Sequence, residues 1–289
     1  MNEVRLLCGL QAEGQANLAY TLTDQYVRER AQFGTEIFQH PDVRKTMFKM
    51  RSMARGLRAL CLYTGSLFDE KTHESEAEIA LLTPVCKSFC TDEALKIASD
   101  AIQMHGGYGF CQEYGIEQFM RDTKITAIYE GTNGIQAIDF VMRKILKDGG
   151  KAFQALGGKM QKTLAEPGMS ELKKEGEMLA MSMQKAMEIA AGFGDLMKKN
   201  RVNMVLQHCT DFLNFSGNLI VAWRLLVHAL KAKELMATAS ADEKIYLEGK
   251  VIDFKIFSHY YLNHNIALAK TITGCDQEVA LLEYWKHPC

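Results

Sequence analysis

The chain has 289 residues, 47% of them hydrophobic, and its 35 acidic and 34 basic side chains leave a formal net charge of −1. This composition supports one large or two moderate hydrophobic cores, gives no indication of disorder, and lacks the basic surplus typical of nucleic-acid binding. No stretch of about 18 apolar residues occurs, the first residues lack a secretory signal pattern, and the eight cysteines are scattered, so we expect no membrane span and reduced thiols in a cytoplasmic location.

The first half of the chain is predicted to be helical. Apolar residues recur there at intervals of three and four, and alternating runs of β-branched residues are absent. The expected helices cover residues 2–31, 41–70, 76–105, 113–121 and 132–147. Gly34 and Pro41 bracket a loop after the first helix. Gly106 and Gly107 can end the third helix, because glycine tolerates positive φ.

The second half shows the same periodicity. The expected helices cover residues 151–165, 169–199, 201–237 and 241–273, which suggests an up-and-down bundle. Gly149 and Gly150 separate the two halves and mark the expected domain boundary. We therefore predict an all-α protein of two consecutive helical bundles, residues 1–150 and residues 151–289.

Several cysteines, methionines and aromatic residues are candidates for a metal site or for the core. Cys86 and Cys90 lie four residues apart on one helical face, but no nearby pair of histidines completes a tetrahedral site, so we expect buried thiols and no metal. Met178, Met181 and Met187 have helical spacing and are expected to fill a core. Four aromatic residues are expected to pack the terminal bundle: Tyr260, Tyr261, Tyr284 and Trp285.

The segment best suited to chemistry is Tyr129-Glu-Gly-Thr-Asn-Gly134. Glu130 precedes Gly-Thr at the expected start of a helix, which places its carboxylate in a turn over a pocket rather than on a solvated helical face. In the purely structural alternative, Thr132 is the N-cap of that helix and Glu130 is only its neighbour. The glycine-rich segment 103–110 can likewise be read as an ordinary helix C-cap.

Four separated blocks of sequence occur in the order found in one enzyme family. They are Asn2–Arg5, Arg28–Gly34, Gln103–Phe110 and Arg121–Gln136. With these blocks, residues 1–147 resemble the C-terminal helical domain of the acyl-CoA dehydrogenases, which is a four-helix bundle. Residues 151–289 are similar to the extra C-terminal helical domain of a longer branch, which includes enzymes that act on 3-(methylthio)propanoyl-CoA.

The resemblance implies a flavin-dependent oxidoreductase that removes the α-proton of an acyl-CoA thioester while a hydride leaves the β-carbon for the flavin. Glu130 matches the family's base, whose own backbone N–H polarises the thioester carbonyl. Gly131 would let the backbone pass close to the substrate, since any Cβ would intrude. Tyr129 and Arg5 match positions near the substrate, although Asn2 stands where the family usually has an aspartate.

The remaining matches indicate a site for FAD. Arg30 matches the arginine that contacts the FAD pyrophosphate, for which a planar guanidinium is well suited, whereas a lone arginine at a helix end is commonly just exposed. The other residues that the resemblance assigns to the cofactor are Gln32, Phe33, Gln103, Gly106, Gly107, Thr132, Asn133 and Gly134. In the family, several of these positions contact the flavin of a neighbouring subunit, which implies a homo-oligomer, either a dimer or a tetramer.

The N-terminal helical domain and the middle β-domain of the family have no counterpart in this chain. The chain therefore resembles a fragment or a separately encoded subunit, whose missing domains a second polypeptide could supply. The resemblance implies acyl-CoA as substrate and an electron-transferring flavoprotein as electron acceptor. The alternative is a catalytically silent helical module of the same descent, which assembles oligomers or binds a partner chain. A large exposed apolar face on residues 1–147 would favour that alternative.

Overall fold

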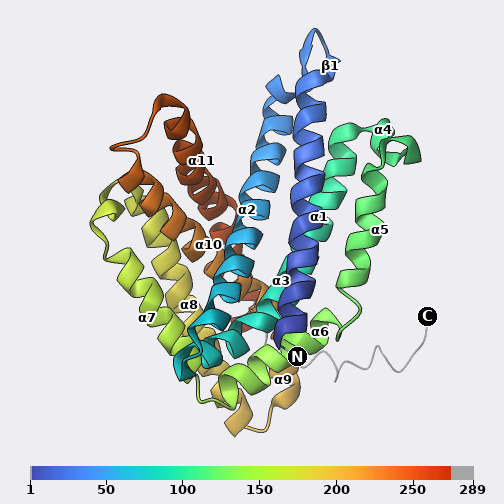
Figure 1. Ribbon diagram of the computed structural model, residues 1–289. Coiled ribbons are helices and arrows are strands. Elements are labelled where there is room, and N and C mark those ends of the chain that lie inside the picture. Colours follow the sequence, from blue (N-terminus) through green and yellow to red (C-terminus); the bar gives the residue numbers. More distant parts are fainter. Residues whose placement is uncertain (1, 275–289) are drawn as a thin grey trace, which may run out of the picture.

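The computed structural model describes residues 2–274, and almost all of them lie in helices (Figure 1). The predicted all-α class is therefore confirmed. Tyr284 and Trp285, for which packing in the terminal bundle is expected, lie outside the described residues. None of the helices between residues 2 and 274 is both long and apolar enough to cross a lipid bilayer.

The first half contains the long helices α1, α2 and α3, followed by shorter ones. Its helices are α1 (Asn2–Glu29), α2 (Pro41–Glu70), α3 (His73–His105), α4 (Gly107–Phe110), α5 (Ile116–Thr126) and α6 (Asn133–Ile138). The shorter elements are the strands β1 (Ala31–Gln32) and β2 (Thr35–Glu36), the 3₁₀ turns η1 (Ile37–Gln39) and η2 (Gln112–Tyr114), and the π-helix η3 (Asp139–Leu146).

The second half continues with helices of both α and π type. Its α-helices are α7 (Lys151–Leu164), α8 (Lys173–Lys198), α9 (Val202–Leu206), α10 (Cys209–Leu235), α11 (Ala241–Phe257) and α12 (Asn263–Thr273). The 3₁₀ helix η4 (Pro167–Leu172) precedes α8, and the π-helix η5 (Ser258–Leu262) joins α11 to α12.

Local sequence explains where the long helices begin and end. Pro41 occupies the first turn of α2, where its missing N–H costs nothing, and Lys71 ends that helix in the left-handed conformation. Thr72 and Ser75 form a capping box at the start of α3, so this helix begins three residues earlier than predicted. The loop expected around Gly34 contains the short antiparallel hairpin of β1 and β2.

Other helix predictions also differ from the structure, and two of them show why. The helix predicted at 113–121 is α5, which starts later because Gly115 adopts φ +69° and which then continues to Thr126. The single helix predicted at 201–237 is divided into α9 and α10 by a turn at Gln207 and His208. The imidazole of His208 lies 3.0 Å from the carboxylate of Asp211 in the first turn of α10, and this local contact stabilises the interruption.

Helices α1, α2, α3 and α5 form the first bundle, with α3 at its centre (Figure 1). Helix α3 is buried on most of its faces because α1 and α5 pack against it on one side and α2 on another. Cys86 and Cys90, on this helix, are both fully buried, which confirms the expected burial of these thiols. The stretch Leu81–Thr91 consists of apolar and small residues apart from Lys87, because it has no solvated face.

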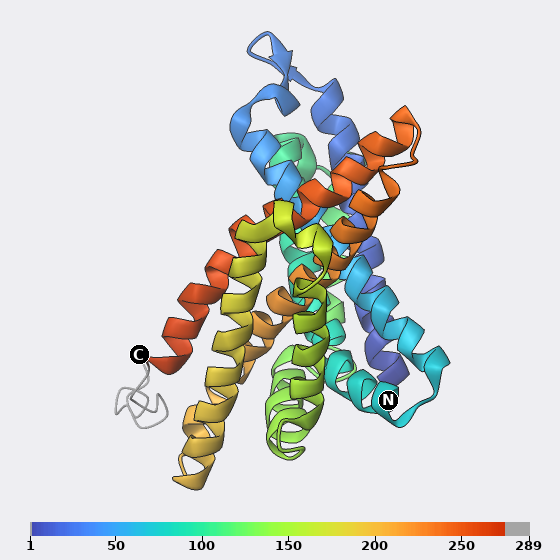
Figure 2. The same ribbon diagram turned by 90° about the vertical axis from the view of Figure 1, so that its left-hand side faces the viewer.

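The second half is built around α10 and packs closely on the first. Gly56 of α2 lies so near α10 that a Cβ there would come within 2.3 Å of Val221, and Gly217 of α10 lies equally near Phe89 of α3. These glycines allow close helix contacts, and one hydrophobic core runs through both halves. Helix α12 runs beside α8 (Figure 2). The proposed division into two domains at residue 150 stays a prediction.

The prediction for the methionines of α8 was partly wrong. Met181 and Met187 are 47% and 40% exposed, while the neighbouring Met183 is buried. Helical spacing predicts which residues share a face, but the position of the neighbouring helices decides which face is covered.

Candidate functional site

Glu130 lies in a turn between α5 and α6 and not on a helix. It has φ +54°, in the left-handed region that residues with a Cβ seldom adopt, and Gly131 follows with φ +86°. The Glu130 side chain is exposed, and within residues 2–274 no group accepts a hydrogen bond from its backbone N–H. The turn therefore presents a carboxylate and an amide donor together at the surface.

The residues around Glu130 divide into exposed ones and buried ones. The hydroxyl of Tyr129 donates a hydrogen bond to the side chain of Gln11 on α1. Thr132 is the N-cap of α6, but its side chain makes no capping hydrogen bond, and Gly134 is exposed in the first turn. A Cβ on Gly131 would lie 2.9 Å from the side-chain nitrogen of Gln136, so this position requires glycine for its surroundings as well as for its φ.

The side chain of Asn133 points into the protein and is fully engaged there. Its Oδ1 accepts a hydrogen bond of 2.8 Å from Lys87, and its Nδ2 donates to Thr91 Oγ1 and Asp92 Oδ1 at 2.9 and 2.8 Å and to the Ser88 carbonyl at 3.2 Å. Lys87 is 0% exposed, and burial lowers the pKa of its ammonium group. Any contact of Asn133 with a cofactor would therefore have to come from its backbone.

Arg5 is also directed into the protein. Its Nη1 lies 2.6 Å from Oδ2 of Asp139, and both side chains are buried. Arg143 lies 3.1 Å from the other oxygen of Asp139. In this structure Arg5 anchors the start of α1 to η3, and its contact with a substrate stays a prediction.

A second group of predicted residues meets at the other end of the first bundle. A cavity of about 660 Å³ is formed there by the ends of α1 and α3, the hairpin, η1, the start of α2 and α4. Five residues predicted to bind FAD line this cavity: Arg30, Gln32, Gln103, Gly106 and Gly107. Phe33 projects from the hairpin just outside the cavity, with φ +54° and an 88% exposed side chain.

The cavity offers a cation, an aromatic ring and an open glycine turn. The guanidinium of Arg30 lies 5.8 Å from the ring centre of Tyr108, and within residues 2–274 no carboxylate pairs with it. A Cβ on Gly106 or Gly107 would meet no atom within 4 Å, so the space beside this backbone is open. An unpaired arginine facing open backbone is a suitable environment for a diphosphate group.

His105 forms the inner wall of this cavity. Its ring stacks on Tyr26 with 4.2 Å between the ring centres, and its Nδ1 lies 2.8 Å from the carbonyl oxygen of Ala101. Burial lowers the pKa of the His105 imidazole, and the contact with the Ala101 carbonyl offsets only part of that effect. The wall is therefore a neutral, stacked imidazole, which suits an aromatic or apolar neighbour.

One chain does not bring these two groups together. Helix α5 separates them: Gly107 and Tyr108 of α4 line the cavity, and α4 lies in the upper part of Figure 1 while α6 lies near the bottom. A helix of 11 residues is about 16 Å long. In one chain, the Glu130 turn and the Arg30 cavity therefore lie about the length of this helix apart.

Sequence reasoning missed two residues that support the Glu130 turn. Lys87 and Gln136 are both almost completely buried, and both are hydrogen-bonded to the segment 130–133. A lysine inside the apolar segment Pro84–Cys90 is a signal that the sequence did contain, because a buried charge requires a partner. Gln136 carries no such signal, since an isolated glutamine on a short helix is usually solvated.

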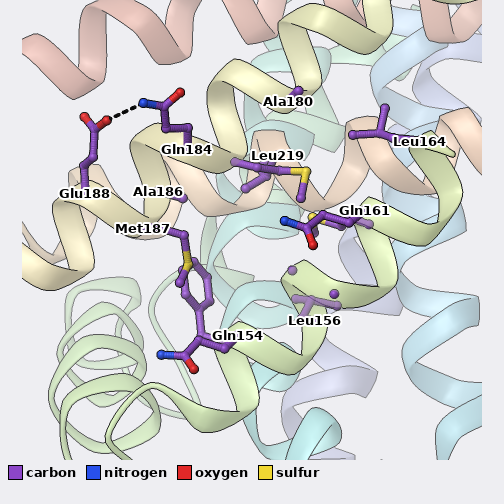
Figure 3. Close-up of a pocket in the computed structure, with 15 residues that line it drawn as sticks. Gln154, Leu156, Gln161, Leu164, Ala180, Gln184, Ala186, Met187, Glu188 and Leu219 are labelled. Atoms are coloured by element: carbon purple, nitrogen blue, oxygen red, sulfur yellow. Dashed lines mark hydrogen bonds between the residues drawn. The ribbon is translucent and has the colours of Figure 1, made fainter.

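A second cavity lies in the second half of the chain, and none of the predicted site residues lines it. This cavity of about 620 Å³ lies between α7, α8 and α10, lined mainly by apolar side chains with the amides of Gln154, Gln161 and Gln184 among them (Figure 3). Gln184 is hydrogen-bonded to Glu188 at one side of it. Across residues 2–274, no group of three or more His, Cys, Asp or Glu side chains is arranged to hold a metal ion.

Comparison with known protein families assigns both halves. The family model described as acyl-CoA dehydrogenase, C-terminal domain, matches residues 1–146, and the one described as acetyl-CoA dehydrogenase C-terminal like matches residues 156–283. The 3-methylmercaptopropionyl-CoA dehydrogenase of Ruegeria pomeroyi is 34% identical over 91% of this chain and 47% of that protein. The broad-specificity linear acyl-CoA dehydrogenase FadE5 of Mycobacterium tuberculosis is 32% identical over 98% of this chain and 51% of that protein.

Solved structures share the fold. An acyl-CoA dehydrogenase from Bacillus anthracis, complexed with FAD, superposes with a TM-score of 0.75 at 22% identity, over 99% of this chain and 50% of that one. Caenorhabditis elegans ACDH-11, in complex with C11-CoA, gives 0.76 at 19% identity, over 95% and 47%. This chain spans about half the length of the curated relatives it matches. The predicted resemblance is confirmed, and the chain belongs to the acyl-CoA dehydrogenase family, of which it carries the C-terminal helical region.

Proposed function

We propose that this chain contributes the catalytic base and part of the FAD site of an acyl-CoA dehydrogenase. The observation that carries this proposal is the left-handed turn at Glu130, which presents a carboxylate and an unengaged backbone N–H side by side. Proton abstraction next to a thioester needs both a base at the α-carbon and a donor at the carbonyl oxygen. Family membership supports the assignment, since Glu130 lies within the matched residues.

The proposed step is a proton transfer to Glu130. The α-carbon–hydrogen bond breaks, its electron pair moves toward the thioester carbonyl, and the proton passes to the Glu130 carboxylate. The backbone N–H of residue 130 donates a hydrogen bond to the carbonyl oxygen, where negative charge develops. A carboxylate is a stronger base when it is removed from water, so the substrate and further protein surface must cover this exposed turn during the reaction.

Apolar side chains beside the turn are available for such a cover. Ile125, Ile128 and Ile135 are 50%, 51% and 56% exposed, and Leu7 on the adjacent α1 is 61% exposed. Exposed apolar residues on neighbouring elements commonly mark an interface. They support a role for further polypeptide or a second copy of the chain in completing the site.

The second group of residues fits an FAD diphosphate. Arg30 is a cation without a carboxylate partner in the part of the chain that the structure describes, and the glycine turn at 106–107 leaves space for a close approach. When bound, FAD supplies the acceptor for the hydride that leaves the β-carbon. Because Arg30 and Glu130 lie at opposite ends of α5, we propose that each copy contributes residues to two flavin sites in a homo-oligomer. We also propose that an electron-transferring flavoprotein accepts the electrons from the reduced flavin.

The proposal is tested in the enzyme completed by the polypeptide that supplies the rest of the relatives' length. Glu130→Gln keeps the size of the side chain and removes the base, so we expect kcat for acyl-CoA oxidation to fall by about 10²–10⁴. Glu3→Gln, at an exposed position on α1, is the matched control and should leave kcat unchanged. Turnover that survives Glu130→Gln would show that another residue is the base.

A catalytically silent module is the second candidate function. The exposed isoleucines near the turn favour it as well, because an assembly surface needs apolar area but no base. Under that alternative, the chain binds its partner or forms its oligomer equally well with Glu130→Gln and Arg30→Ala, and the assembly oxidises no acyl-CoA. FAD titration of the completed assembly separates the two candidates, since only the catalytic one predicts that Arg30→Ala weakens flavin binding there.

A further inference from the structure

A buried amide lies directly beneath the Glu130 turn. Gln136 is 1% exposed, and its Nε2 donates hydrogen bonds to the carbonyl oxygens of Glu130 and Gly131 at 3.2 and 3.3 Å. The opposite orientation of the amide would set its Oε1 against two carbonyl oxygens, so the chemistry of the contacts fixes which atom faces the turn. One side chain thus binds both of the consecutive left-handed residues.

The turn needs such support because its backbone conformation is unfavourable. A glutamate at φ +54° brings its Cβ close to its own carbonyl oxygen, and the resulting strain is comparable to what two neutral hydrogen bonds contribute. The position of the Gln136 amide also requires glycine at residue 131, because a Cβ there would lie 2.9 Å from Nε2 of Gln136. Without these contacts, Glu130 would relax toward ordinary φ values and its carboxylate and N–H would change direction.

The start of α6, which carries Gln136, is fixed to α3. The backbone N–H of Asn133 closes the turn on the Ala127 carbonyl at 3.2 Å, and the Asn133 side chain binds Lys87 on α3. Gln136 is one helical turn further along α6, where its own N–H donates to the Thr132 carbonyl at 3.1 Å. The amide of Gln136 therefore acts from a helix that the buried contacts of Asn133 hold in place.

We propose that Gln136 is a positioning residue for Glu130, which holds the left-handed turn so that the carboxylate and the N–H of residue 130 face the same ligand. This inference rests on the proposed role of Glu130 as the base. It goes beyond that role because it proposes that Gln136, which is buried beneath the turn and does not touch the substrate, determines the direction of the Glu130 carboxylate.

Hydrogen–deuterium exchange of the full chain tests the structural part without any activity. In Gln136→Met, which keeps a long apolar stem but has no amide, we expect a peptide covering residues 127–134 to exchange about tenfold faster, because two hydrogen bonds are lost. Peptides from α3 should keep their protection. Gln118→Met is the matched control, since Gln118 is exposed on α5 and its hydrogen-bond partner among residues 2–274 is Asp122. Unchanged exchange at 127–134, or an equal increase in α3, would overturn the inference.

A second variant covers the case in which Gln136→Met does not fold. Gly131→Ala lies on the exposed turn, outside the core, and its Cβ should displace the amide of Gln136. We expect it to increase exchange in the same peptide and nowhere in α3. If the turn keeps its protection in Gly131→Ala, the amide does not hold it, and the inference fails.

Kinetics in the completed enzyme separate this inference from the proposed function. Butyryl-CoA serves as the probe substrate. Gln136→Met should lower kcat at least about tenfold and leave KM within about twofold, because binding surfaces remain while the base is misdirected. If Glu130→Gln leaves turnover intact, the proposed function fails, whatever Gln136 does. If Glu130→Gln abolishes turnover and Gln136→Met has the wild-type kcat, the positioning role alone is wrong.

Discussion

The two ends of α5 are constructed differently. At its carboxyl end, the Glu130 turn is tied to the interior by Gln136 and, through Asn133, by Lys87. At its amino end, Arg30 and the glycine turn line an open cavity, and Phe33 projects into solvent. Buried hydrogen bonds within the chain hold the carboxyl end, whereas the residues at the amino end face an open cavity that a ligand can enter.

This difference corresponds to what each end is proposed to do. A base must be aimed to within a fraction of an ångström, so its backbone is fixed before the substrate arrives. Residues that hold a cofactor shared between subunits can become ordered when the oligomer forms, because the cofactor and the second copy supply the missing contacts. The comparison predicts large effects on stability at the carboxyl end and large effects on binding at the amino end.

The largest effect is expected at Asn133. Asn133→Leu keeps the branched shape of the side chain but leaves the buried ammonium of Lys87 without its hydrogen bond, so we expect the free energy of unfolding to fall by about 3 kcal/mol. Chemical denaturation measures it. Thr132→Ala is the control and should change stability by less than about 0.5 kcal/mol, because the Thr132 side chain makes no capping bond.

A double variant shows whether the buried charge is the cause. Adding Lys87→Met to Asn133→Leu removes the unpaired ammonium and should recover part of the lost stability. If the double variant is less stable than Asn133→Leu alone, the loss comes from the packing of α6 against α3 and not from the lysine.

A smaller effect, on binding and not on stability, is expected at Arg30. Arg30→Ala should weaken FAD binding about 10- to 100-fold, measured by flavin fluorescence in the oligomer that binds the cofactor, because a charge-assisted contact to phosphate is lost. Arg28→Ala, two residues earlier, is the matched control: Arg28 pairs with Asp24 and lies over Phe38, outside the cavity. Equal affinities for Arg30→Ala and wild type would remove Arg30 from the proposed site.

The smallest effect is a pH dependence at the cavity end. The pKa of His105 is lowered by burial from its ordinary value of 6.5, so the unfolded chain takes up a proton on this residue before the folded chain does. The contribution of neutral His105 to stability is therefore complete above about pH 6.5 and is lost as the pH falls below it. His105→Phe keeps the stack on Tyr26 and should lose less stability than wild type between pH 7 and pH 5.5.

Denaturation curves at the two pH values check this prediction. His73→Phe is the control for the substitution itself, because the side chain of His73 is 99% exposed at the start of α3, at the other end of the helix from His105. A pH dependence identical in wild type and His105→Phe would mean that His105 is protonated equally well in the folded and unfolded states.

Much of the helical framework could be predicted from local sequence, and the errors have local or packing causes. Apolar periodicity places the start of α3 three residues too late, because the capping box of Thr72 and Ser75 lies before the first periodic residue. The helix at 201–237 was predicted as continuous because apolar periodicity runs through His208, where the backbone turns. Met181 and Met187 were assigned to the core from spacing alone, which does not reveal how far the neighbouring helices extend over a face.

The sequence by itself determined the helical class, the family, and the position of Glu130 in a turn, because these depend on periodicity, on glycine at 131 and on four blocks in a fixed order. Only the tertiary structure decided that Arg5 pairs with Asp139, that Lys87 binds Asn133, and that Arg30 lies at the opposite end of α5 from Glu130. The first two contacts join residues 134 and 46 positions apart. Such pairings follow from how helices pack around a common core, and no local propensity specifies them.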